Sequence, residues 1–178
     1  MKSRIIFDLQ PVLRGEHLEL RPLRADDYQN LYTVAADPLI WEQHPERDRY
    51  VEDVFKVFFL AALESGGALV AIDSSTNKVI GSSRFYGYEQ DKGVVEIGWT
   101  FLARSHWGGF YNREMKQLML SHAFKFADCV IFLVNPENMR SQHAVEKFGA
   151  VRVGSRPDGA GRNSTVYQVT ASSFSRDT

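Results

Sequence analysis

Apolar and polar residues follow two alternating patterns in the first third of the chain. Residues 17–22 alternate polar and apolar side chains, as expected of a half-buried strand. Apolar residues then recur at helical spacing over residues 28–35 and 51–63, and two aspartates before the first of these helices offer an N-cap. Asp37-Pro38 and Gly66-Gly67 are expected to end the two helices, because neither pair favours continued helical backbone.

Three strands are predicted next, at residues 68–72, 78–88 and 95–101. A turn at residues 73–77 and an Asp-Lys-Gly hairpin at residues 91–93 separate them. In the third strand, the apolar positions 95, 97, 99 and 101 alternate with Glu96, Gly98 and Thr100. Glu96 is therefore expected on the opposite face of the strand from Val95, Ile97, Trp99 and Phe101.

The remaining pattern is a helix over residues 111–126, an uninterrupted apolar strand at 129–134, a helix at 138–148, and strands at 151–154 and 165–170. The resulting order is β-α-α-β-β-β-α-β-α-β-β. It predicts an α/β (α+β) fold in which helices flank one mixed central sheet. At about 150 residues per domain, residues 1–178 are expected to form a single domain.

Composition narrows the function classes. The chain has 21 basic and 22 acidic residues, so no positive excess is available for a nucleic acid partner. Its single cysteine excludes an internal disulfide and a cysteine-based zinc site, and its histidines lack ligand spacing, so no metal is expected. The apolar run at residues 129–134 is far too short to cross a membrane, and so is the one at residues 57–63. We expect a cytoplasmic protein without a membrane partner, because residues 1–8 resemble no targeting segment.

A loop at residues 106–109 leads into the longest predicted helix. A helix N-terminus offers free backbone N–H groups and a positive dipole end, and Gly108 and Gly109 would let a phosphate approach closely. Glycines are also common before helices for structural reasons alone. Taken by itself, this feature leaves both interpretations open.

Four segments resemble the GCN5-related N-acetyltransferase (GNAT) superfamily. Trp107-Gly108-Gly109-Phe110-Tyr111-Asn112-Arg113-Glu114 resembles its acetyl-CoA-binding loop. Asn135-Pro136-Glu137-Asn138-Met139-Arg140-Ser141, with Glu146-Lys147-Phe148-Gly149, resembles its N-x-x-N-x-x-S…E-K-x-G-F segment. Glu96-Ile97-Gly98-Trp99 and the strand at residues 13–22 are similar to segments of the branch that includes ribosomal-protein N-terminal acetyltransferases. The resemblance therefore covers about residues 13–154 and implies a GNAT-like sheet.

This resemblance implies acetyl-CoA as the acetyl donor. The backbone of Phe101 and Leu102 would contact its pantetheine arm, and Asn138 would bind the same arm through its amide. The loop would hold the phosphates through Trp107, Gly108, Gly109, Phe110, Tyr111, Asn112 and Arg113. Phe110 and Asn112 depart from the family pattern, which has glycine and a small residue at these positions. The alternative role of Asn138 is to cap the last helix.

Acetyl transfer to an amine requires a base and an acid. Glu96 is the candidate base, because a carboxylate in a partly apolar cleft has a raised pKa; its alternative is a surface charge. Ser141 is the candidate acid by its match to the family position, with Tyr167 as a second candidate.

The acceptor is a primary amine whose identity the sequence leaves open, either a small molecule or a protein N-terminus. Trp41 and His44 lie in an aromatic and charged segment that would wall the acceptor site, or would only cap the core. His106 adjoins the phosphate loop and could touch the cofactor, although a place at the solvated surface is expected. Family members often form dimers, which makes a homodimer one of the implied states.

The leading interpretation is an N-acetyltransferase that works by direct transfer in a ternary complex. Its alternative is a catalytically degenerate acyl-CoA-binding module, to which the changes at Phe110 and Asn112 point. A dinucleotide-binding oxidoreductase is excluded, because no G-x-G-x-x-G joins a strand to a helix.

Overall fold

A single sheet organises the molecule. The computed structural model describes residues 6–174 and places eight strands in the order β1-β2-β3-β4-β5-β6-β8-β7. The strands are β1 (Leu13–Arg14), β2 (Leu18–Pro22), β3 (Ala68–Asp73), β4 (Lys78–Glu89), β5 (Val94–Leu102), β6 (Cys129–Val134), β7 (Val151–Pro157) and β8 (Asn163–Thr170). Neighbouring strands within this part of the chain run antiparallel except β5 and β6, which are parallel. The sheet is therefore mixed, as the sequence predicts.

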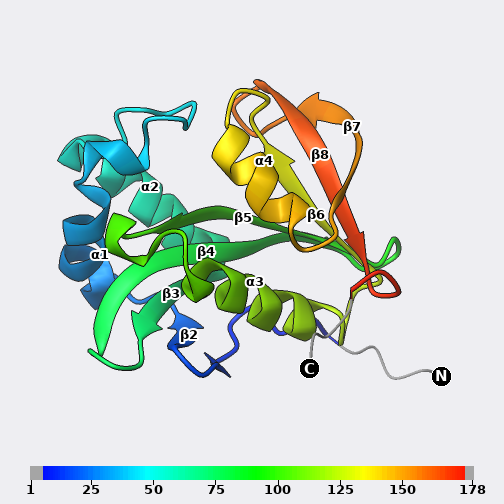
Figure 1. The fold of residues 1–178 in the computed structure, drawn as a ribbon, viewed down its shortest axis with the longest axis horizontal. Coiled ribbons are helices and arrows are strands. Elements are labelled where there is room, and N and C mark those ends of the chain that lie inside the picture. The colour runs from blue at the N-terminus through cyan, green and yellow to red at the C-terminus, as the bar shows by residue number, and fades with distance from the viewer. Residues whose placement is uncertain (1–5, 175–178) are drawn as a thin grey trace.

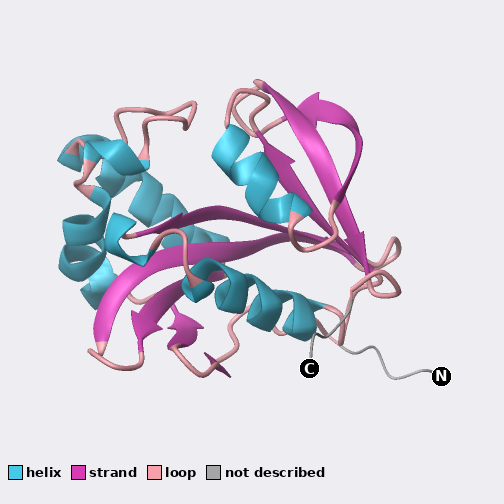
Figure 2. Cartoon of the chain, in the orientation of Figure 1, coloured by secondary structure: helices cyan, strands magenta, loops and turns pink. Residues whose placement is uncertain are grey.

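Helices cover both faces of the sheet (Figures 1 and 2). α1 (Tyr28–Ala35) and α2 (Glu52–Ser65) pack on one face, around an apolar cluster that includes Leu31, Phe55 and Phe101. α3 (Phe110–Ala123) and α4 (Met139–Glu146) contribute to a second cluster on the other face. Three short 3-10 turns, η1 (Ala25–Asp27), η2 (Pro38–Ile40) and η3 (Arg104–His106), complete the described helical segments.

The two central strands separate soon after they meet. β5 and β6 are paired over three positions only, Val94–Glu96 against Cys129–Ile131. Beyond Glu96, β5 continues along β4 alone, up to the pair Gly81 and Leu102. Figure 1 shows the two halves of the sheet diverging from this point. Backbone groups on the β6 side of β5 are therefore left without a strand partner.

The separation coincides with an irregularity at Trp99. This residue has a φ of 53°, and the β4–β5 register shifts beside it. The shift reverses the alternation of side chains: Ile97 packs in the α3 cluster, whereas Phe101 packs in the α1–α2 cluster. The expectation that Trp99 and Phe101 share a face with Ile97 is therefore wrong.

The other elements match the sequence closely. The limits of β6 are those predicted, and α1 spans the predicted residues 28–35. The long helix is shorter than predicted, because after Ala123 the chain forms turns in which the Phe126 N–H bonds the Ala123 carbonyl. β1 was not anticipated as a separate strand. No helix within residues 6–174 is long and apolar enough to span a membrane.

Candidate active site

The loop before α3 leaves open space at the helix N-terminus. Gly108 has a φ of 70°, and Gly109 is the N-cap residue and has no side chain with which to cap the first turn. A Cβ added to either glycine would meet no atom within 4 Å. The backbone at these glycines therefore admits close approach by a ligand, and a helix N-terminus suits a phosphate.

Asp73 anchors this loop to the end of β3. Its carboxylate accepts hydrogen bonds from His106 Nε2 at 3.0 Å and from the Tyr111 hydroxyl at 3.1 Å. It also accepts from the Ser75 hydroxyl at 2.7 Å and the Ser75 N–H at 2.8 Å, and these donors hold the Asp73 pKa well below its usual range. The His106 side chain is only 18% exposed, so its expected place at the solvated surface is wrong.

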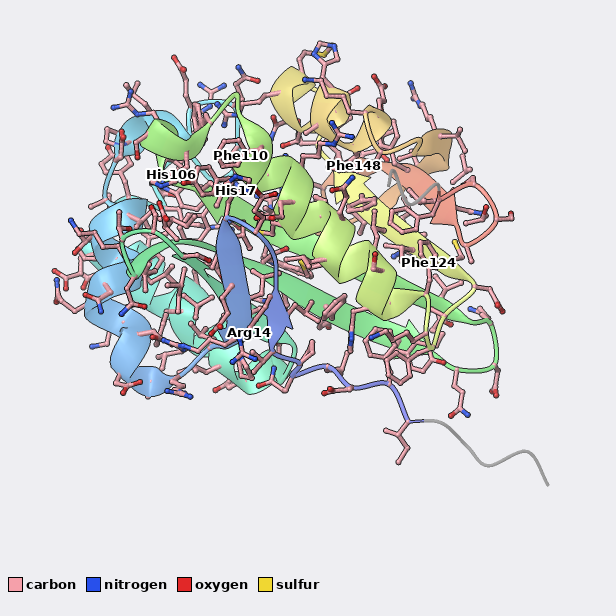
Figure 3. The ribbon with its side chains drawn as sticks, turned by 60° about the horizontal axis from the view of Figure 1, so that its bottom comes forward. Arg14, His17, His106, Phe110, Phe124 and Phe148 are labelled. Carbon is pink, nitrogen blue, oxygen red and sulfur yellow. The ribbon has the colours of Figure 1, made fainter. Side chains whose placement is uncertain are left out.

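Phe110, the main departure from the family pattern, turns toward the β1–β2 connection. Its ring packs on the His17 ring with 3.8 Å between centroids, and it also contacts Tyr111 (Figure 3). A Cβ on Gly108 would meet no Phe110 atom within 4 Å. The bulky side chain therefore leaves the backbone at Gly108 open.

Glu114 fixes the orientation of α3. Its carboxylate accepts from three successive backbone N–H groups, those of Glu16 at 2.6 Å and of His17 and Leu18 at 3.0 Å each. Gly15 is required at this contact, because a Cβ there would lie 2.5 Å from the Glu114 side chain. Glu114 is part of the motif, but this anchoring role was not predicted from it.

The groups expected at the pantetheine arm lie around the separation of β5 and β6. Phe101 and Leu102 pair with β4, and the Leu102 carbonyl accepts the Trp107 indole N–H at 2.9 Å. Asn138 is 6% exposed and caps α4, its Oδ1 accepting from the Ser141 N–H at 3.1 Å. The capping role is therefore present. The Asn138 Nδ2 makes no hydrogen bond within residues 6–174 and remains available to a ligand.

Glu96 is a buried carboxylate at the point where the strands part. Only 9% of the residue is exposed, and burial raises its pKa to about 7, although the charges of Arg156 and Arg84 act in the opposite direction. Its Oε1 would lie 3.3 Å from a Cβ on Gly98, so the carboxylate reaches along its own strand. A carboxylate with this pKa can accept a proton at neutral pH.

The two candidate acids differ in their surroundings. Ser141 lies in the first turn of α4, on the sheet face opposite Glu96, and its hydroxyl bonds no group in the described part of the chain. The Tyr167 hydroxyl has acceptors in Gln142 and Glu146, each at 3.1 Å. Burial and the Glu146 carboxylate raise the pKa of Tyr167, which makes it a weaker acid. The Ser141 hydroxyl is thus the one not engaged by an acceptor in the described part of the chain, and the choice between the two acids stays a prediction.

The predicted acceptor residues precede α2. Trp41 is 2% exposed, and its indole N–H donates to the Ala35 carbonyl at 2.8 Å, so the ring has a packing role. His44 Nδ1 accepts from the Glu46 N–H, and burial together with the Arg49 charge lowers the His44 pKa to about 4. His44 is therefore neutral at physiological pH. Contact of either side chain with an acceptor stays a prediction.

Three buried cations were not predicted from the sequence. Arg49 and Arg84 lie on the Glu96 face, and Lys116 lies under β5 on the α3 face. Lys116 follows Met115 within the apolar pattern of its helix, and Arg84 lies between Ser83 and Phe85 in a predicted strand. A charged residue inside an apolar pattern is the sequence signal that could have identified Arg84 and Lys116 as buried cations.

The comparisons with known proteins agree with this geometry. Residues 17–151 match the family model described as the acetyltransferase (GNAT) domain. The chain belongs to the GNAT acetyltransferase family. It is accordingly an acyltransferase, with the mixed sheet of that family. No curated protein matches the chain.

Solved structures of GNAT proteins resemble the fold over most of its length. A GCN5-related N-acetyltransferase from Brucella melitensis is 20% identical with a TM-score of 0.80, covering 92% of this chain and 80% of its own. Mycobacterium smegmatis RimJ in complex with CoA-disulfide is 19% identical, with a TM-score of 0.66 and coverages of 91% and 87%. Spermidine N-acetyltransferase from Vibrio cholerae, in complex with CoA and spermine, is 17% identical, with a TM-score of 0.69 and coverages of 89% and 98%.

Proposed function

We propose that this GNAT protein transfers the acetyl group of acetyl-CoA directly to a primary amine bound beside Glu96. The observation that carries the proposal is the buried Glu96 carboxylate, whose pKa is raised to about 7 at the place where β5 and β6 separate. A base with a pKa near neutrality is what deprotonation of an alkylamine requires.

The chain offers a matching set of groups for acetyl-CoA. The open N-terminus of α3 suits the pyrophosphate, the unpaired side of β5 suits an extended amide-containing arm, and Asn138 Nδ2 is a free donor. Two structures with the same fold, RimJ and the spermidine acetyltransferase, were solved with CoA-disulfide and CoA. Bound acetyl-CoA would supply the thioester carbonyl that the amine attacks.

The two proton transfers are assigned to residues on the two faces of the sheet, Glu96 as the base and Ser141 as the acid. Glu96 takes a proton from the acceptor amine as the new C–N bond forms, directly or through water. Backbone N–H groups on the β6 side of β5 are the donors available to the carbonyl oxygen. Ser141, on the opposite face, gives a proton to the departing sulfur as the C–S bond breaks. Base and acid thus come from different elements, strand β5 and helix α4.

The second candidate is a binding module without turnover, suggested by Phe110 and Asn112. Phe110 packs on His17 and leaves the loop open, so this departure gives little support to lost binding. The retained Glu96 and Ser141 also favour an enzyme.

Two measurements test the proposal. Calorimetry with acetyl-CoA and with CoA should show binding at micromolar concentrations, and a panel of amines should show amine-dependent release of thiol. Glu96→Gln should lose turnover while keeping CoA affinity, whereas Glu64→Gln, at an exposed position on α2, should keep both. Binding without turnover on any amine would identify the module instead, and no binding would reject both candidates.

A further inference from the structure

Two buried arginines lie on the Glu96 face of the sheet and have no part in the proton transfers. Arg84 is 5% exposed and Arg49 is 6% exposed. Arg84 pairs with Gly98 in the β4–β5 ladder, while Glu96 pairs with Tyr86, so Arg84 and Glu96 project from the same sheet face. Two residues of strand separate their positions, a distance of about 7 Å along the sheet.

Aromatic rings hold both guanidinium groups. The Arg84 guanidinium carbon lies 4.4 Å from the Trp99 ring centre and 5.7 Å from that of Phe58. The Arg49 guanidinium carbon lies 4.5 Å from the same Phe58 ring and 5.2 Å from the Trp41 ring. Stacking occupies the flat faces of the cations and leaves their N–H groups without a partner from the rings.

The two buried arginines on this face differ in their partners. Arg49 forms an ion pair with Glu46, which also accepts from Arg162 at 3.3 Å, and Arg162 pairs with Asp158 at 3.1 Å. The Arg84 side chain forms no hydrogen bond or ion pair within residues 6–174, and the Nε atoms of both Arg49 and Arg84 are buried without a partner. Burial and the neighbouring Arg49 charge lower the pKa of Arg84 to about 10, so the group is still a cation at neutral pH.

A buried guanidinium without an anion is costly, unless a ligand supplies the anion. The acidic groups near the arginine pair are Glu46 and Asp158, which are paired, Asp48, whose charge acts on Arg49, and Glu96, which is half protonated at pH 7. The basic groups are Arg49, Arg84, Arg156 and Arg162. Among them, Arg84 is the buried cation whose side chain has no carboxylate partner within residues 6–174.

We propose that Arg84, assisted by Arg49, binds a carboxylate of the acceptor, and that the acceptor is a small amino acid-like molecule. This inference rests on the proposed function, because it assigns the amine of the same molecule to Glu96. A planar guanidinium recognises a carboxylate through two parallel hydrogen bonds. The unmatched positive charge disfavours polyamines, which are cations throughout.

The surrounding loops favour a small acceptor over a polypeptide. The Arg162–Glu46 contact joins the segment between Trp41 and α2 to the connection between β7 and β8. These two loops come from distant parts of the sequence and meet beside the arginine pair. Two loops joined in this way admit a small molecule more readily than a polypeptide that would have to pass between them.

Matched acceptors test the inference on the native protein. Amino acids, including β-alanine and 4-aminobutyrate as spacers of increasing length, are compared with their amides and with the corresponding amines that lack the carboxylate. We expect kcat/KM for at least one amino acid to be at least about tenfold higher than kcat/KM for its amide. One bidentate contact accounts for a difference of this size. The Kd of the same acids for the CoA-loaded protein is measured in parallel by calorimetry.

Variants separate a carboxylate contact from a general effect on the fold. Arg84→Gln should abolish the preference for the acid, raising KM at least about tenfold with kcat less affected, while CoA affinity is unchanged. Arg84→Lys should restore part of the preference, and Arg47→Gln, at an exposed position in the same loop as Arg49, should change nothing. Thermal unfolding confirms that each variant is folded, and the wild-type panel decides the question if Arg84→Gln is not.

The outcomes distinguish this inference from the proposed function. Equal or better acetylation of amides or polyamines would overturn the carboxylate assignment and leave the acetyltransferase proposal intact. Acetylation of acidic peptide N-termini alone would overturn the small acceptor. Failure of all acceptors to bind or react, despite CoA binding, would overturn both proposals.

Discussion

The Lys116 ammonium donates a hydrogen bond to Thr100 Oγ1 across 2.5 Å, directly beneath the irregular part of β5. Thr100 Oγ1 lies in turn 2.8 Å from the Ser83 hydroxyl, and the Phe132 ring packs 5.4 Å from the Lys116 nitrogen. Helix α3, strand β5 and strand β4 are thus joined through one buried cation. Burial lowers the Lys116 pKa from 10.5 to about 7.

Lys116→Met should stabilise the protein more at pH 6 than at pH 9. The unfolded chain keeps Lys116 protonated up to about pH 10, whereas the folded protein releases the proton near pH 7, so the contribution of this group to stability rises with pH between these values. Thermal unfolding of both proteins at both pH values measures the difference, at about 2–4 °C per kcal/mol for a domain of this size. An equal effect at both pH values would show that Lys116 does not titrate in this window.

Glu96→Gln should reduce kcat/KM by about 10²–10⁴-fold. The loss should be largest above pH 7, where the wild-type carboxylate is ionised, and the wild-type rise of activity through pH 7 should disappear. Glu64→Gln serves as the control. A variant that retains the same rise would exclude Glu96 as the base.

The same substitution should increase stability at neutral pH. The folded pKa of Glu96 lies above its ordinary value of 4.5, so its contribution to stability falls as pH rises from 4.5 through 7. Glu96→Gln removes this loss, and its advantage over the wild type should shrink toward pH 4.5. Unfolding in urea at pH 5 and pH 8 measures the two differences.

Two substitutions of Asn138 separate its cap from its free amide. Asn138→Ala should cost about 1 kcal/mol of stability through loss of the cap, and should also weaken CoA binding by about 1–3 kcal/mol. Asn138→Asp keeps an acceptor for the Ser141 N–H but lacks the Nδ2 donor. It should therefore be as stable as the wild type and bind CoA weakly. Unaltered CoA affinity in the aspartate variant would leave only the capping role.

Asp73→Asn should weaken CoA binding by loosening the phosphate loop. The charged carboxylate accepts hydrogen bonds from His106 and Tyr111. Hydrogen bonds to a charged group are stronger than neutral ones, and each contributes about 1.5–3 kcal/mol. Asp53→Asn, at an exposed position in the first turn of α2, is the matched control. Calorimetric titration with CoA compares them, and equal affinities would show that the loop needs no such anchor.

Much of the architecture follows from the sequence pattern. β6 is predicted at its observed limits, because an uninterrupted apolar run is typical of a short strand that is buried on both faces. The reversal of faces after Gly98 could not be predicted, because one residue with positive φ shifts every later side chain without changing the apolar pattern. Trp99 carries no local signal for that conformation, since the left-handed region is typically occupied by glycine.

The candidate site divides in the same way. Glu96, Ser141 and the glycine pair belong to contiguous segments that a resemblance can identify. Arg49 and Arg84 come together only when the segment before α2 folds over β4, so their shared position depends on tertiary packing. Sequence spacing contains no information on that contact.

The brief pairing of β5 with β6 makes the molecule two half-sheets joined by a seam three residues long. An extended ligand lying beyond Glu96 would act as an additional short strand, completing the ladder that the polypeptide leaves unfinished. Donor binding and the mutual attachment of the two half-sheets are then thermodynamically linked. Slowed amide exchange on both sides of the seam should therefore accompany saturation with CoA, even at positions that the ligand does not touch.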